Sequence, residues 1–73
     1  MAKLFLDTTG MKCPLPLLKL ATMMPSIKSG DLLEIVGDCY TFDTDIKKWC
    51  NELGKVLVVV TRVNNSFRAE IQF

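Results

Sequence analysis

The chain has 73 residues, of which 49% are hydrophobic and 23% are charged, as in a compact globular protein. We expect one domain over residues 1–73, because at this size folding buries roughly 60% of the extended chain's surface. Nine Lys and Arg against eight Asp and Glu give a net charge of +1. Domains that bind nucleic acids are usually strongly basic, so this charge argues against direct nucleic-acid binding.

Histidine is absent, and the chain has three cysteines. Without histidine it lacks the commonest general base and a frequent zinc ligand. No two cysteines have CxxC spacing, and an odd number cannot pair completely. We therefore expect neither a metal site nor a cofactor.

The N-terminal segment reaches an acidic residue, Asp7, before the apolar core of a signal peptide forms. The longest aliphatic run, residues 56–60, is far too short to cross a bilayer. These features predict a cytoplasmic protein with no membrane span, whose thiols are normally reduced.

The first half of the chain predicts a strand, a helix and a second strand. Residues 3–7 form a strand with apolar side chains on both faces. Cys13-Pro14-Leu15-Pro16 then opens a helix that runs to about Met24. Proline is tolerated there because the first helical N–H groups have no acceptor within the helix. The second strand is expected over residues 31–36.

The second half predicts a helix and two strands. The helix extends from about Phe42 to Leu53, with Thr41 as its N-cap. Residues 55–62 form a third strand, Asn64-Asn65 a tight turn, and residues 67–73 a strand with one buried face. Five residues at helical spacing form the expected buried face of this helix: Phe42, Ile46, Trp49, Cys50 and Leu53.

The predicted element order is therefore β-α-β-α-β-β. The first two strands should be parallel, with a right-handed crossover, and the last two should form an antiparallel hairpin. We predict an α+β two-layer sandwich, in which a mixed four-stranded sheet carries both helices on one face.

The segment from the first strand to the first helix resembles the TusA/SirA-like family of small sulfur-carrier proteins. Its mark is a CPxP motif after the first strand, matched here by Leu6-Asp7, Gly10 and Cys13-Pro14-Leu15-Pro16. That family has the sandwich predicted above, also found in the C-terminal domain of translation initiation factor three. The resemblance continues over nearly the whole chain: Gly30-Asp31, Leu33-Glu34-Ile35, Asp38, Asp45-Ile46, Trp49-Cys50 and Gly54.

The resemblance implies a sulfur carrier that holds sulfane sulfur as a persulfide on Cys13. The sulfur would come from a donor protein such as a cysteine desulfurase or a rhodanese. It would pass to an acceptor protein, in tRNA thiolation or another sulfur pathway. Such a sulfurtransferase-like carrier works between proteins, which agrees with the absence of histidine.

Sulfur transfer requires a sulfur that can attack and leave as an anion. Cys13 is expected at the N-cap of the first helix, where the helix dipole favours an anion. Pro16 has no N–H, so the N–H of Leu15 is expected to be the main donor to the sulfur. Pro14 and Pro16 would stiffen the turn, and Lys12 adds positive charge nearby.

The first helix also predicts a docking surface. Leu15 projects between Lys19 and Thr22, with Pro16 and Met23 flanking this polar side. An exposed Leu15 is either a scattered apolar residue or part of a partner-binding patch. The face expected to be buried holds Leu17, Leu18, Leu20, Ala21 and Met24. Residues expected to contact a partner are Met11, Lys12, Leu15 and Lys19.

The other two cysteines differ in their expected roles. Cys50 lies on an apolar helical face and is interpreted as a buried structural residue. Cys39 follows the second strand, and parallel neighbouring strands end at one edge of a sheet, so its loop should lie beside that of Cys13. Cys39 is therefore a possible auxiliary thiol. The alternative function is a redox regulator or an interaction module that uses Cys13 and Cys39.

Overall fold

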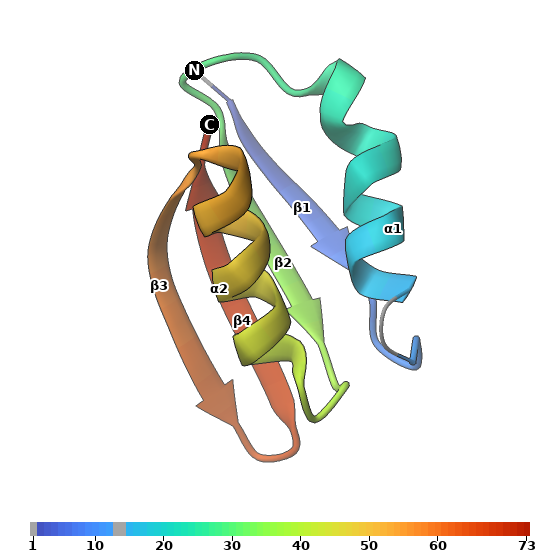
Figure 1. Ribbon diagram of the computed structural model, residues 1–73. Helices are drawn as coiled ribbons and strands as arrows, with labels where there is room; N and C mark the ends of the chain where they lie inside the picture. Colours follow the sequence, from blue (N-terminus) through green and yellow to red (C-terminus); the bar gives the residue numbers. More distant parts are fainter. Residues whose placement is uncertain (1, 13–14) are drawn as a thin grey trace.

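The computed structural model describes residues 2–12 and 15–73 and confirms the α+β two-layer sandwich. A four-stranded sheet carries both α-helices on one face (Figure 1). Among the described residues, no helix is long and apolar enough to cross a membrane. The elements are β1 (Lys3–Asp7), α1 (Leu15–Met23), the short 3-10 helix η1 (Met24–Ser26), β2 (Leu32–Gly37), α2 (Phe42–Leu53), β3 (Val56–Val63) and β4 (Ser66–Gln72).

The strand order in the sheet is β1-β2-β4-β3. β1 and β2 are parallel, and β4 is antiparallel to both β2 and β3. Asn64 has a positive φ of 56°, which confirms the predicted tight turn of the last hairpin. Three strands, β1, β2 and β3, therefore run in one direction. They end at the end of the molecule that contains the loops 8–12 and 38–41, which we call the loop end (Figure 1).

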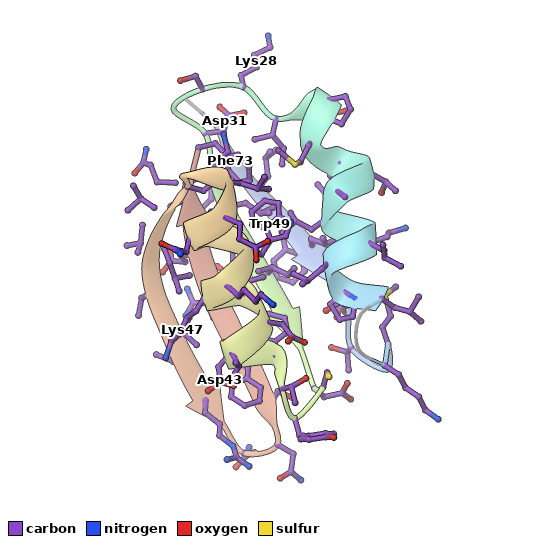
Figure 2. All side chains as sticks on the ribbon, in the orientation of Figure 1. Lys28, Asp31, Asp43, Lys47, Trp49 and Phe73 are labelled. Atoms are coloured by element: carbon purple, nitrogen blue, oxygen red, sulfur yellow. The ribbon has the colours of Figure 1, made fainter. Side chains whose placement is uncertain are left out.

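The core lies between the sheet and the two helices. β2 and β4 alternate strictly in burial, so every second side chain faces the helices. At the loop end the rings of Phe42 and Phe67 stack with centroids 5.8 Å apart. At the opposite end Trp49 meets Phe73 edge-on at 6.2 Å (Figure 2). These aromatic pairs hold α2 on the sheet.

The buried face of α1 was predicted incorrectly in part. Leu20 is fully buried, but Leu18 is 56% exposed and Ala21 is also exposed. Pro16, expected beside the polar side, is buried. The reason is the position of α1 over β1, at the edge of the sheet, where a helix buries only a narrow stripe (Figure 1).

The bounds of α2 agree with the prediction, but two details differ. Thr41 occupies the N-cap position without capping the helix by its side chain. Its hydroxyl instead donates to Asp45 Oδ2 at 3.0 Å. Leu53, expected on the buried face, is 46% exposed because it lies in the last turn, just before Gly54 ends the helix with a φ of 69°.

Asp31 fixes both ends of the chain. Its carboxylate accepts the N–H groups of Lys28 and Ala2, each at 3.0 Å, and these bonds lower the pKa of Asp31. The Phe73 N–H donates to the Asp31 carbonyl at 2.9 Å, and the Gly30 N–H donates to the Phe73 carbonyl at 2.7 Å. The first and last described residues therefore lie together, at the end of the molecule opposite the loop end (Figure 2).

Gly37 closes β2 where the core is tightest. A Cβ at this position would lie 2.5 Å from Thr8 Oγ1 and 2.9 Å from the ring of Phe42. We predict that Gly37→Ala lowers the free energy of unfolding by about 1–3 kcal/mol, because neither buried neighbour can move freely. Urea denaturation measures this change. In a protein that already carries Phe42→Leu, Gly37→Ala should lower the free energy of unfolding by less. An unchanged urea midpoint in the Gly37→Ala variant alone would contradict the close packing.

Candidate functional site

The loops that follow β1 and β2 are joined by hydrogen bonds at the loop end. The Gly10 N–H donates to Asp38 Oδ1 at 2.9 Å. The N–H and the hydroxyl of Thr8 both donate to the Val36 carbonyl, at 2.8 and 2.6 Å. The expectation that these two loops are neighbours is therefore confirmed. The Thr8 bonds extend the β1–β2 contact beyond the last paired residues, so both loops start from fixed positions.

In the sequence, the predicted sulfur site stands between the loop after β1 and the start of α1. Cys13 and Pro14 are outside the described residues, so the N-cap role of Cys13 stays a prediction. The Leu15 N–H donates to the Lys12 carbonyl at 2.8 Å. Its expected hydrogen bond to the sulfur of Cys13 falls on a residue outside the described ones and stays a prediction. Pro16 stands in the first turn of α1, as the motif predicted.

Cys39 is held in the loop after β2. It is 9% exposed, and its Sγ lies 3.4 Å from Thr41 Oγ1. Its carbonyl accepts the N–H of Phe42 at 2.9 Å, so the residue is also tied to the start of α2. Cys39 is disulfide-bonded. Its side chain is therefore fixed at the loop end.

Cys50 has a different environment. It is a free, buried cysteine in the last turn of α2, which confirms its interpretation as a buried residue. Burial raises the pKa of the Cys50 thiol to about 11. The thiol therefore stays protonated at neutral pH, and a protonated thiol is a poor nucleophile.

An exposed apolar surface covers the first part of α1. Leu15 is 49% exposed and Leu18 is 56% exposed. Together with Met11, Lys19 and Thr22 they line a shallow depression of about 290 Å³, which we call the α1 patch. Met11, Leu15 and Lys19, three of the residues expected to contact a partner, thus line one depression, and their role in docking stays a prediction.

The composition of the α1 patch differs from the prediction in two positions. Lys12 is exposed but does not line the depression, whereas Leu18 does. Leu18 was expected on the buried face of α1, but it lies at the surface because the buried stripe is narrower than the helical wheel indicates. Two leucines one helical turn apart, Leu15 and Leu18, are the sequence signal for a two-residue apolar surface.

The comparisons with known proteins cover nearly all of the chain. The family model described as sulfurtransferase TusA matches residues 4–73. The sulfur carrier protein TusA of Pseudomonas putida is 38% identical over 53 residues, which are 73% of this chain and 66% of that protein. A candidate sulfur carrier protein of Methanocaldococcus jannaschii is 33% identical over 67 residues, 92% of this chain and 89% of the relative.

A candidate sulfur carrier protein of Neisseria meningitidis is 30% identical over 67 residues, which are 92% of this chain and 90% of that protein. The matched length in these relatives agrees with the extent of the family model. The resemblance noted at the CPxP segment therefore extends through the sheet and both helices. The chain belongs to the sulfurtransferase TusA family.

Proposed function

We propose that this protein is a sulfur carrier that holds sulfane sulfur as a persulfide on Cys13 and passes it between a donor protein and an acceptor protein. Family membership and the sulfur-carrier names of its relatives support this role. The observation that carries the assignment is the position of Cys13, in the CPLP segment, two residues before α1 begins. A sulfur anion near a helix N-terminus is stabilised by the helix dipole.

The proposed transfer is a pair of thiol exchanges. The Cys13 thiolate attacks the outer sulfur of a persulfide on the donor, the donor S–S bond breaks, and the donor cysteine leaves as a thiolate. A nucleophile of the acceptor then attacks the outer sulfur of the Cys13 persulfide, and Cys13 leaves as a thiolate. The helix N-terminus stabilises Cys13 as both attacking and leaving group. Neither step needs an acid or base from this histidine-free chain.

Intact-mass spectrometry tests this function. The reduced protein is incubated with a cysteine desulfurase and cysteine, and a carrier gains the mass of one sulfur atom. A reaction without cysteine is the control. No gain in mass, in a reaction where the desulfurase forms its own persulfide, would contradict the proposal. A gain that disappears when an acceptor protein is added would show the second transfer.

We further propose that Cys39 is an auxiliary thiol that pairs with Cys13. The hydrogen bond that joins their loops and the disulfide-bonded state of Cys39 support this role. The Cys39 thiolate would attack the inner sulfur of the Cys13 persulfide, hydrosulfide would leave, and a Cys13–Cys39 disulfide would form. If redox regulation were the function instead, mild oxidation would remove two hydrogens and the desulfurase would add no sulfur.

The α1 patch is proposed to contact the sulfur partners, since two of its residues, Met11 and Leu15, stand two positions before and two positions after Cys13 in the sequence. We predict that Leu15→Glu slows sulfur transfer from the donor severalfold. The same change should alter the free energy of unfolding by no more than about 0.5 kcal/mol, because Leu15 is exposed. Single-turnover kinetics and thermal denaturation measure the two effects.

Ala21→Glu is the matched control for this prediction. It adds the same charge to an exposed position of α1 that does not line the patch. This control should transfer sulfur at the parent rate, whereas Leu18→Glu should behave like Leu15→Glu. Equal slowing by all three substitutions would mean that added negative charge, and not lost apolar contact, causes the effect.

A further inference from the structure

β3 is an unusually apolar edge of the sheet. Of the strands that the structure describes, only β4 pairs with it. The six residues between Lys55 and Arg62 carry no charge. The opposite edge strand, β1, is only five residues long and has a charged residue at each end, Lys3 and Asp7. Three valines of β3 are more than half exposed: Val56 at 60%, Val58 at 53% and Val63 at 60%. Exposed apolar edges without charges are templates for pairing with another strand.

The backbone of β3 is oriented for such pairing beyond its bulge, which lies between Leu57 and Val59. Val63 and Ser66 are partners across the two-residue turn of the hairpin. In an antiparallel ladder the backbone groups point alternately toward and away from the partner strand. The backbone groups of Val63, next to the turn, point toward β4. Because the direction alternates along the strand, the N–H and C=O groups of Arg62 and Val60 point away from β4, toward the open edge.

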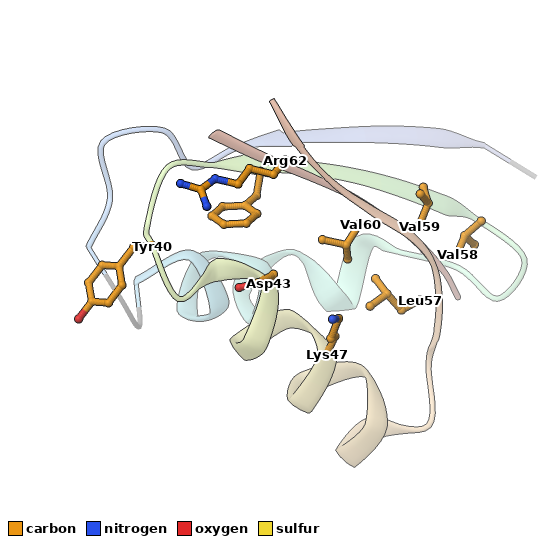
Figure 3. A pocket seen from close by; sticks show the side chains of 9 residues that line it. Tyr40, Asp43, Lys47, Leu57, Val58, Val59, Val60 and Arg62 are labelled. Carbon is orange, nitrogen blue, oxygen red and sulfur yellow. The ribbon is translucent and has the colours of Figure 1, made fainter. Parts of the chain in front are cut away.

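A groove of about 440 Å³ runs beside this edge, between β3 and α2 (Figure 3). Leu57, Val58 and Val60 contribute apolar side chains to it. Tyr40, which is 87% exposed, and Arg62 also line it. Tyr40 directly follows Cys39, and Arg62 is near the C-terminal end of β3. The groove therefore reaches the loop end.

The charges beside the groove favour an acidic partner. Arg62 lies 5.5 Å from the ring centroid of Phe67, and Lys47 lines the groove from α2. Every ion pair within residues 2–12 and 15–73 is formed by side chains of β1, β2 and β4, so neither cation has a carboxylate partner there. Asp43 is the single acidic residue that lines the groove among the described residues. A carboxylate from outside can therefore pair with Arg62 or Lys47.

We propose that β3 and this groove bind an extended segment of a partner protein that adds a strand to the sheet. Its main chain would pair with Val60 and Arg62, its apolar side chains would cover Leu57 and Val60, and a carboxylate would lie beside Arg62. A second copy of this chain fits less well, since residues 55–63 contain two basic and no acidic residues. The surface is separate from the α1 patch, and its test requires no sulfur transfer.

A set of synthetic ten-residue peptides tests the proposal. The peptides alternate Val and Thr and carry one Glu at successive positions, and a second set carries Lys in place of Glu. Added to the ¹⁵N-labelled protein, a matching Glu peptide should shift the amide signals of β3 and of the first turns of α2 saturably. Hydrogen exchange should slow at Val60 and Arg62. The matched Lys peptide should bind about fivefold more weakly, the size expected for an exposed ion pair.

Three variants separate strand addition from unspecific adhesion. Val58→Lys places a charge on the open edge and should weaken binding about tenfold or more. Phe5→Lys is the matched control, because Phe5 is 59% exposed on the opposite edge strand, and it should bind as the parent does. Arg62→Gln should remove the preference for Glu over Lys peptides.

Three outcomes would overturn the proposal. One is the absence of saturable shifts with every peptide up to millimolar concentration. Another is equal weakening by Val58→Lys and Phe5→Lys. The third is a concentration-dependent dimer with slow exchange at Val60 and Arg62 when no peptide is present, since β3 would then bind a second copy of the chain.

Discussion

Cys13→Ser is expected to abolish sulfur loading completely while the protein stays folded. A serine hydroxyl cannot form a persulfide, and serine is a preferred residue at a helix N-cap, the position expected for Cys13. Intact-mass spectrometry after incubation with a desulfurase and cysteine should show no added sulfur in the variant. Its thermal denaturation midpoint should lie close to that of the parent.

The other two cysteines supply the controls for this experiment. Cys39→Ser should still load sulfur on Cys13 but form no intramolecular disulfide after mild oxidation. Cys50→Ser should also load sulfur, with reduced stability, because a hydroxyl would replace a buried thiol. Loading of the Cys13→Ser variant at the parent rate would show that the sulfur is carried elsewhere. Loss of loading in Cys39→Ser alone would assign the carrier role to Cys39.

Phe42→Ala is expected to cause the largest loss of stability. Phe42 is 2% exposed, begins α2 and stacks on Phe67. Removing a buried phenyl ring costs about 3–5 kcal/mol. A protein of 73 residues has a total stability of roughly 4–11 kcal/mol, so this single change would remove much of it.

Urea denaturation followed by the fluorescence of Trp49 measures the effect of Phe42→Ala. Trp49 is half-buried against Phe73, at the other end of α2, so its signal reports on the whole helix. Phe5→Ala is the control, because Phe5 is 59% exposed and its removal should cost no more than about 0.5 kcal/mol. A loss below 1 kcal/mol for Phe42→Ala would be incompatible with the tight contact between its ring and Gly37.

The fold could be predicted from the sequence because its elements carry strong local signals. The alternation over residues 67–73 and the spacing of Phe42, Ile46 and Cys50 each specify one buried face. The turn at Asn64 and the helix end at Gly54 depend on residues that tolerate positive φ, as both do here. These features are encoded within a few neighbouring residues, so no knowledge of distant contacts was needed.

The features that were not predicted depend on contacts between distant parts of the chain. Leu18 is exposed because α1 lies over the edge strand β1, and a helical wheel does not contain this information. The groove beside β3 exists because the order β1-β2-β4-β3 places a valine-rich strand at an edge. A run of valines is otherwise typical of a strand buried on both faces.

The turn around Asp31 determines which end of the molecule stays accessible when the protein is attached to a surface or to another domain. Ala2 and Phe73 are bound to the same turn, and the loops that follow β1 and β2 project from the other end of the sheet (Figure 1). A tether or a fused domain beside Ala2 or Phe73 therefore leaves the loops 8–12 and 38–41 unobstructed. The protein can be anchored to a bead or sensor chip by one end and still present the loop end to incoming proteins.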